Sequence, residues 1–396
     1  MDDFEFVATK LLTRKAWAYY FSASDDMISK SINNSVYRSI LLRPRVFVNC
    51  VACDTSTSLF GQKVGTPLYA SPTAMARLAH SDGEWGIAQG ISRFGAVQIV
   101  SNNASMTPEQ VVRDAPKGQV FGWQLYVQNN LQKSEAMLER ISRPEMRKYY
   151  KFLVLTLDAP WPGKRELDER MQFEGGFSIK AGDDVQSPPV AKGGIGQQLF
   201  AGTAADLTWE TTLPWLVEKT DLPIVLKGVQ TYEDALLAAR HADKVRVIIL
   251  SNHGGRGVDT APPAVHTLLE IRKYCPEVFE KIDIWVDGGI KRGTDIVKAL
   301  CLGAKGVGIG RLPLWGLAAG GKRGVERVFE NNADVRDFLF LASSAGRNGK
   351  VPETFRCSDN SGFRAMINTR AVERDCFAGV EKPAAPGIKK GRRPRL

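Results

Sequence analysis

Eight short apolar segments recur between residues 67 and 309, and each is followed by a stretch that can form a helix. Their near-continuous apolar character is typical of parallel strands that are buried on both faces. Eight such units in series predict an α/β fold of the (β/α)8 TIM-barrel type. The predicted strands are 67–70, 97–100, 120–127, 152–158, 224–227, 245–250, 282–286 and 306–309.

Other segments are predicted to be additions to this barrel. Apolar residues on one helical face predict an N-terminal helix over residues 4–20, and the chain from there to about residue 65 is expected to be irregular. Residues 160–207, after the fourth strand, lack a regular pattern, so we expect a mobile loop that covers the barrel mouth. We assign residues 1–340 to the barrel and 341–396 to a diverged C-terminal segment with a disordered basic tail.

Charge and composition exclude several classes of function. The chain has 396 residues and a net charge of +10, but much of the excess lies in residues 389–395 without interleaved aromatic residues. We therefore expect a solvated tail and no nucleic-acid partner. No apolar run approaches the roughly 20 residues that span a bilayer, and the acidic start does not resemble a signal peptide. No H-x-x-x-H pair is present, so we expect no metal, and we expect the six cysteines to be reduced thiols.

Polar side chains follow the predicted strands at their carboxyl ends. In a barrel these eight ends converge on one face, which is where barrel enzymes place their chemistry. The sequence therefore favours an enzyme over a purely structural barrel. The residues are Ser71, Pro72 and Thr73; Ser101 and Asn103; Gln124 and Tyr126; Thr156 and Asp158; Lys227; Ser251 and His253; Asp287 and Gly289; and Gly310 and Arg311.

Residues 248–259 carry the most specific combination of side chains. His253 is suited to move protons near neutral pH, and the planar guanidinium of Arg256 matches a carboxylate. The glycines between them allow a sharp turn close to a ligand. This combination predicts a site for an acid substrate with an abstractable proton. The alternative is an ordinary strand-end loop with a capping histidine and a solvated arginine.

A second group of residues predicts a phosphate site. Glycines follow the seventh and eighth predicted strands, and a helix that starts at Gly293–Thr294 adds the positive end of its dipole. Lys291 and Arg311 add full charges at the position where many barrels hold a phosphate. The alternative is that these glycines only form tight turns. Lys227 is predicted either to stabilise negative charge on the ligand or simply to pair with Asp287. A Rossmann nicotinamide site is disfavoured, because no G-x-G-x-x-G follows the first strand.

The sequence resembles the FMN-dependent 2-hydroxy acid oxidase/dehydrogenase family, and within it most of all the flavin domain of the fungal flavocytochrome L-lactate dehydrogenases. The resemblance runs from Phe4 to about Arg327. The segments that carry it are 16–20 (AWAYY), 72–75 (PTAM), 124–126 (QLY), 156–160 (TLDAP), 226–229 (LKGV), 251–256 (SNHGGR), 287–289 (DGG), 292–295 (RGTD) and 299–304 (ALCLGA).

The resemblance implies that an L-2-hydroxy acid is oxidised to the 2-oxo acid by FMN. His253 would be the base, held and made more basic by Asp158, while Arg256 and Arg165 would bind the substrate carboxylate. Tyr19 and Tyr126 would contact the substrate through their hydroxyls, and Lys227 would stabilise the reduced flavin. The remaining cofactor contacts would come from Ser71, Pro72 and Thr73 near the flavin N5; Ser101, Gln124 and Thr156 at the ring; Ser251 at the ribityl chain; and Asp287, Gly289, Lys291, Gly310 and Arg311 at the ribityl–phosphate end.

Departures from the family pattern leave alternatives open. Asn103 occupies a substrate-pocket position that is often bulky and apolar in relatives, so a substrate other than lactate is plausible. Lys291 replaces a usual arginine and loses its bidentate fork. A barrel that binds FMN or phosphate without turnover, as a binding or biosynthetic-accessory protein, is the alternative function. Electrons would pass to oxygen or an external acceptor, since no haem-binding segment precedes Phe4.

The resemblance also implies a homo-oligomer, specifically a tetramer, and we expect no membrane partner. The C-terminal Pro394-Arg395-Leu396 weakly resembles a peroxisomal S-K-L-type signal. We therefore expect a cytoplasmic or peroxisomal protein.

Overall fold

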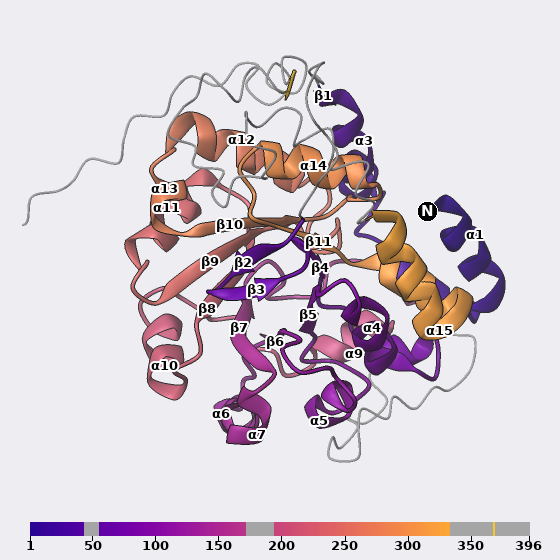
Figure 1. Cartoon of the computed structure of the whole chain (residues 1–396), viewed down its shortest axis with the longest axis horizontal. Coiled ribbons are helices and arrows are strands. Elements are labelled where there is room, and N and C mark those ends of the chain that lie inside the picture. The colour runs from indigo at the N-terminus through magenta and orange to yellow at the C-terminus, as the bar shows by residue number, and fades with distance from the viewer. Residues whose placement is uncertain (43–54, 172–193, 333–366, 369–396) are drawn as a thin grey trace, which may run out of the picture.

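Eight parallel strands close into a barrel in the spatial order β10-β11-β4-β5-β6-β7-β8-β9 (Figure 1). The computed structural model describes residues 1–42, 55–171, 194–332 and 367–368. The barrel confirms the predicted fold class, and each predicted strand overlaps an observed one. The strands are β4 (Leu68–Ala70), β5 (Val97–Val100), β6 (Phe121–Leu125), β7 (Tyr150–Thr156), β8 (Ile224–Val229), β9 (Val245–Leu250), β10 (Asp283–Asp287) and β11 (Gly306–Ile309).

Helices surround the barrel and complete its outer hydrophobic layer. Buried aliphatic residues on these helices pack against the outward faces of the strands. The helices after the strands are α4 (Gly83–Ser92), α5 (Pro108–Val112), α6 (Leu131–Ser142), α7 (Pro144–Arg147), α10 (Thr212–Lys219), α11 (Tyr232–Arg240), α12 (Ala264–Tyr274), α13 (Val278–Lys281), α14 (Gly293–Cys301) and α15 (Arg311–Asn332), with a short 3-10 helix at Ala76–Leu78. The predicted helix start at Gly293 is correct.

The barrel interior is filled by side chains and closed at its amino-terminal end by a hairpin. Strands β2 (Thr57–Leu59) and β3 (Gln62–Val64) form that hairpin, which crosses the barrel in Figure 1. At its tip, the Phe60 ring stacks on Phe152 with 4.4 Å between centroids and lies 5.3 Å from the Trp285 ring. The hairpin thus fills this end of the barrel, and the polar strand ends lie at the opposite, carboxyl-terminal end.

Two predictions for the N-terminal segment are wrong. The helix predicted over 4–20 is two helices, α1 (Asp2–Leu11) and α2 (Arg14–Phe21), because Leu12 is extended and the Thr13 hydroxyl caps α2 by accepting from the Ala16 N–H at 3.2 Å. The stretch predicted to be irregular contains the hairpin and a further helix, α3 (Ile28–Ser39). Residues Leu41–Leu42 (β1) pair antiparallel with Ile367–Asn368 (β12).

The predicted loop 160–207 contains two short helices, so the expectation of no regular structure is wrong for its described parts. These are α8 (Glu166–Arg170) and α9 (Ile195–Phe200). The Asp168 carboxylate joins them by accepting from the Ile195 and Gly196 N–H groups at 3.2 and 2.8 Å. Residues 172–193 lie outside the described residues, as does the predicted C-terminal segment except for 367–368. The predicted lid, domain boundary and tail therefore stay predictions.

Two further observations concern the described part of the chain. None of its helices is long and apolar enough to cross a membrane. Cys275 and Cys301 are buried free thiols within it. The other four cysteines, including the C-x-x-C pair Cys50 and Cys53, lie outside the described residues.

Candidate active site

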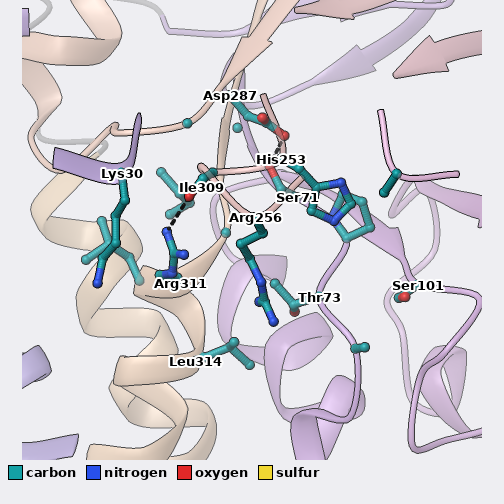
Figure 2. A pocket seen from close by; sticks show the side chains of 18 of the residues that line it. Lys30, Ser71, Thr73, Ser101, His253, Arg256, Asp287, Ile309, Arg311 and Leu314 are labelled. Atoms are coloured by element: carbon teal, nitrogen blue, oxygen red, sulfur yellow. Dashed lines mark hydrogen bonds between the residues drawn. The ribbon is translucent and has the colours of Figure 1, made fainter. Parts of the chain in front are cut away.

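The carboxyl ends of the barrel strands surround one large pocket of about 1380 Å³, including its open mouth (Figure 2). The barrel brings the sequence-predicted residues together here. Asp158 and Ser251 lie behind the pocket wall and contact lining residues. The predicted residues that line the pocket are Tyr19, Ser71, Pro72, Thr73, Ser101, Asn103, Gln124, Tyr126, Thr156, Arg165, Lys227, His253, Arg256, Asp287, Gly289, Lys291, Gly310 and Arg311.

His253 and Asp158 form an oriented pair at the pocket floor. The His253 Nδ1 lies 2.8 Å from Asp158 Oδ1, and Nε2 lies 3.4 Å from the Tyr126 hydroxyl. A carboxylate can only accept, so Nδ1 carries the proton and Nε2 is left as the basic nitrogen. His253 has φ of +58°, an unusual backbone conformation for a non-glycine residue, and its N–H donates to Ser251 Oγ at 3.0 Å.

Asp158 raises the pKa of His253, which is the direction that the sequence predicted for this pair. Removal from water lowers the pKa of His253, and the opposing effect of Asp158 does not overcome it. Lys227 and Arg256 lower this pKa further. Asp158 itself stays ionised, because Lys227 and His253 outweigh the effect of burial and lower its pKa. His253 is therefore a neutral imidazole at pH 7, ready to accept a proton.

Lys227 lies beneath His253 between two buried carboxylates. Its Nζ is 3.8 Å from Asp158 Oδ2, 3.8 Å from Asp287 Oδ2, and donates to Ser251 Oγ at 3.0 Å. Burial alone would lower the pKa of Lys227, but the two carboxylates raise it overall. Both alternatives drawn from the sequence are compatible with this geometry, since Lys227 lines the pocket and also pairs with Asp287.

A glycine bulge at the end of β8 allows this close packing. The pairing of β8 with β9 shifts register between Lys227 and Val229, and Gly228 has φ of +99°. A Cβ atom at Gly228 would lie 2.5 Å from the Cβ of Asp158. Only glycine lets the strand approach Asp158 in this way.

Two arginines flank Tyr19 on the N-terminal side of the pocket. The Arg256 Nη2 donates to the Tyr19 carbonyl at 2.9 Å, and its Cζ lies 4.8 Å from the Tyr19 ring centroid. The Arg165 Cζ lies 5.7 Å from the same ring. Burial and the neighbouring Arg256 lower the pKa of Arg165 to about 10, so it remains charged at neutral pH. Two cations at one wall form a site for a carboxylate.

Helix α9 forms another wall of the pocket and is fastened to the barrel by Asn103. The Asn103 Nδ2 donates to the Leu199 carbonyl at 3.3 Å, and its Oδ1 accepts from Asn102 Nδ2 at 3.2 Å. The Phe200 ring lies 5.0 Å from that of Tyr126. Asn103 therefore positions Leu199 and Phe200 at the pocket.

Gly289, Lys291, Gly310 and Arg311 lie at the other end of the pocket. Arg311 donates to three backbone carbonyls, those of Tyr20 at 2.9 Å, Gly254 at 3.2 Å and Ser22 at 3.0 Å. Burial and Arg256 lower the pKa of Arg311 to about 9. Lys291 instead pairs with carboxylates of α1, at 3.1 Å from Asp2 and 3.5 Å from Glu5.

Sequence reasoning missed two kinds of residue at this site. Lys30 and Glu5 line the pocket, but they lie on helices whose position relative to the barrel no sequence pattern indicated. Asn33 and Asn252 exchange amide hydrogen bonds of 2.8 and 2.9 Å, which dock α3 against the loop of His253. Asn252 immediately precedes His253, so its place in the loop was the only available signal.

The chain can be compared with known proteins once this geometry is established. The family model described as FMN-dependent dehydrogenase matches residues 8–341. The chain belongs to this family. It is 39% identical over 333 residues to L-lactate dehydrogenase (cytochrome) of Wickerhamomyces anomalus, covering 83% of this chain and 56% of that protein. It is 37% identical to 2-hydroxyacid oxidase 2 of Mus musculus, covering 83% and 89%.

Two solved structures share the fold of this chain over most or all of its length. The flavin-binding domain of baker's yeast flavocytochrome b2 matches with a TM-score of 0.77 and 30% identity, covering 100% of this chain and 92% of that one. A mandelate oxidase matches with a TM-score of 0.76 and 28% identity, covering 86% and 94%. The chain spans 56% and 55% of the two fungal lactate dehydrogenases to which it is similar.

The pocket residues fit FMN, the cofactor of this family. Gln124 Nε2 and Thr156 Oγ1 are buried without a hydrogen-bond partner among the described residues, although such groups are nearly always paired. Polar groups at the barrel mouth suit the carbonyl and nitrogen edge of a flavin ring. At the other end, a Cβ on Gly310 would meet nothing within 4 Å, which leaves room for a ligand beside its backbone. No cluster of potential metal ligands occurs among the described residues.

Proposed function

We propose that this chain binds FMN and oxidises an L-2-hydroxy acid to the 2-oxo acid. The single observation that carries the proposal is the His253–Asp158 pair, 2.8 Å apart, in the same pocket as Arg256 and Lys227. A base, a carboxylate clamp and a cation beside a flavin-sized pocket together match this reaction. Family membership supports the proposal.

His253 is the proposed base. Its Nε2 accepts one of the two protons that the substrate loses, while Asp158 holds the imidazole through Nδ1 and stabilises the imidazolium that forms. The Tyr126 hydroxyl lies 3.4 Å from His253 Nε2, so it is placed to contact the substrate beside the base. The lowered pKa of His253 keeps it neutral in the resting enzyme.

Arg256 and Arg165 are the proposed carboxylate site, with Tyr19 between them. Both guanidinium groups already face one aromatic ring, so little side-chain entropy is lost when a carboxylate binds. Binding of the carboxylate by these two arginines would hold the substrate with its C2 atom beside His253. Asn103, Leu199 and Phe200 face the substrate side chain and set its size.

FMN, when bound, supplies the acceptor for the two electrons that leave the substrate. The ring is held by Ser101, Gln124 and Thr156, with backbone of Ser71, Pro72 and Thr73 near its reactive edge. Asp287, Gly289, Lys291, Gly310 and Arg311 would hold the ribityl–phosphate end. Ser251, behind the pocket wall near the ribityl chain, would position Lys227 and the backbone of His253. Lys227, which lines the pocket between Asp158 and Asp287, would supply a positive charge beside the cofactor ring.

Purified protein reconstituted with FMN tests the proposal directly. We expect anaerobic addition of a suitable L-2-hydroxy acid, from a panel with short, branched and aromatic side chains, to bleach the flavin absorbance. Flavin that binds but stays oxidised across the panel would support the alternative of a binding or accessory barrel without turnover. Protein that binds no FMN would overturn the proposed oxidation and leave, of the alternative, only a barrel that binds another phosphate. Oxygen uptake during turnover, with an external cytochrome or quinone added in parallel, identifies the electron acceptor.

Quaternary state and location are separate parts of the proposal. A tetramer is expected from the family resemblance, and light scattering on the purified protein tests it. A cytoplasmic or peroxisomal location rests on the sequence of residues 394–396, and a fluorescent fusion with and without these residues tests it.

A further inference from the structure

Lys30 lies beside Arg311 in the pocket (Figure 2). We call this part of the pocket, where Gly289, Lys291, Gly310 and Arg311 are proposed to hold the phosphate, the phosphate end. Lys30 projects from α3, and its Nζ donates to the Phe21 carbonyl at 2.7 Å and lies 3.0 Å from the centroid of the Phe21 ring. Ser101, which lies near the proposed ring position, is at the far side of the same view. Lys30 is thus placed far from the proposed chemistry but inside the cofactor pocket.

Lys30 is not neutralised by the protein. Lys227 and Lys291 each pair with two carboxylates, whereas Lys30 and Arg311 form no ion pair with any described residue and are held by backbone carbonyls. Burial and the nearby Arg311 lower the pKa of Lys30 to about 7. An under-neutralised cation in a partly buried site is costly unless an anion joins it.

Charge at this end of the pocket indicates which anion fits. Among the residues that line it there, Lys291 and Arg311 are offset in part by Glu5, which leaves a net charge of +1. Lys30 raises that charge to +2. A phosphate monoester carries about −1.5 to −2 at neutral pH. Because Lys291 is paired with Asp2 as well as Glu5, Lys30 and Arg311 are the cations at this end that have no carboxylate partner among the described residues, and Lys30 brings the positive charge there closer to that of the phosphate.

We propose that Lys30 is a third cation for the FMN phosphate, acting with Lys291 and Arg311. This inference rests on the proposed binding of FMN. Its Nζ can turn from the Phe21 carbonyl to a phosphate oxygen, because that carbonyl lies at the C-terminal end of α2 beside the pocket. Lys30 would thereby couple α3, and through it the loop of His253, to the bound cofactor.

Comparison of FMN with riboflavin distinguishes phosphate binding by Lys30 from a packing role of its side chain, because riboflavin has the same ring and ribityl chain but lacks the phosphate. We expect Lys30→Met to weaken FMN binding roughly 10- to 100-fold, as for loss of a charge-assisted hydrogen bond, measured by quenching of flavin fluorescence. Riboflavin affinity should change less than about twofold. Lys30→Arg, which keeps the charge, should retain most of the FMN affinity. Lys63→Met, on exposed β3 at the closed end of the barrel, is the matched control.

The pH dependence of the wild-type chain gives a second readout. The charged groups that face Lys30 are Arg311, Lys291, Arg256 and Glu5. Free Lys30 loses its proton as the pH rises from 6.5 to 8.5, so the ratio of FMN to riboflavin affinity should fall over this range. Lys30→Arg should flatten that fall, which keeps the test available if Lys30→Met does not fold.

The outcomes distinguish this inference from the function on which it rests. Equal weakening of FMN and riboflavin by Lys30→Met would make Lys30 a packing residue and overturn the assignment. An unchanged FMN affinity would overturn it as well, while leaving FMN binding and the proposed oxidation intact. Failure of the wild-type chain to bind FMN at all would overturn both.

Discussion

The two ends of the pocket handle buried charge in different ways. Around His253 and Lys227 the buried charged groups pair with one another: Asp158 pairs with His253 and Lys227, and Lys227 also pairs with Asp287. At the phosphate end, Arg311 and Lys30 are held by carbonyls of α2 and its C-terminal loop. The first end is organised before a ligand arrives, whereas the second keeps positive charge available for an anion. Chemistry and cofactor retention should therefore respond to different substitutions.

Replacement of the base should have the largest effect. His253→Asn removes the basic nitrogen, and asparagine tolerates the positive φ of 58° at this position better than most residues do. We expect kcat to fall about 10²- to 10⁴-fold, with FMN affinity changed less than about threefold. Stopped-flow measurement of flavin reduction checks the expected fall in rate, and fluorescence titration checks the expected FMN affinity. A parallel loss of FMN binding would show that the two ends of the pocket are not independent.

Asp158→Asn should have the next largest effect. It changes how the His253 imidazole is held and the pH at which that imidazole is neutral. The asparagine cannot stabilise the imidazolium, so we expect the maximal rate to fall by about 10²-fold or more. His253 accepts a proton only when neutral, so activity is lost as the pH falls through its pKa, which burial lowers from the usual value for histidine in the wild-type chain. Loss of the Asp158 carboxylate removes an influence that raises this pKa. The acid limb of the kcat/KM profile should therefore move to lower pH. A shift to higher pH would contradict the assigned pair.

Asp259→Ala should act mainly at the phosphate end. The Asp259 carboxylate caps α3 by accepting from the Ile28 and Ser29 N–H groups at 3.2 and 2.8 Å. Loss of such a cap costs about 0.5–2 kcal/mol, and α3 carries Lys30. We expect a lower urea midpoint and weaker FMN binding, with the rate of substrate oxidation at saturating FMN nearly unchanged. A reduced rate in the fully loaded protein would contradict this separation.

Asn103→Ala should have the smallest effect, confined to the substrate side. It removes the hydrogen bond to Leu199 that fastens α9, worth about 0.5–1.5 kcal/mol. We expect a change of a few-fold in KM that depends on the size of the substrate side chain, with FMN affinity unchanged. Comparison of a small and an aromatic 2-hydroxy acid measures this. Equal effects on both substrates would mean that Asn103 does not shape the pocket.

The barrel and most of the pocket could be predicted because both follow from local patterns. Buried parallel strands leave continuous apolar runs, and closure of the barrel brings their polar ends together whatever lies between them. Asp158 and His253 are 95 positions apart yet in contact for this reason. Their places at strand ends were sufficient to predict that they meet.

Helix α3 was missed, and its buried face is only half apolar: Val36 and Tyr37 share it with two polar residues. Its buried face includes Ser29 and Asn33, which bond to the loop of His253, while Ile28 and Ile32 are exposed. Apolar periodicity can indicate such a helix, but it cannot place the helix against residues over 200 positions away, because Ser29 and Asn33 make those contacts through polar groups. Lys30 was missed with it. The effect of burial on the pKa of His253, which opposes and outweighs that of Asp158, was missed for a related reason, since burial depends on the whole fold.

The contacts of Arg311 bear on how this protein can be shortened or recombined. Its guanidinium joins the carbonyls of Tyr20 and Ser22 to that of Gly254, so the segment before the barrel forms part of the wall around the reactive groups. A minimal barrel that starts at β4 would lack Tyr19. Arg311 would keep the Gly254 carbonyl but lose those of Tyr20 and Ser22, while it still faces Arg256. Any chimera or trimmed expression version of the chain therefore has to carry its first two helices together with the eight strands.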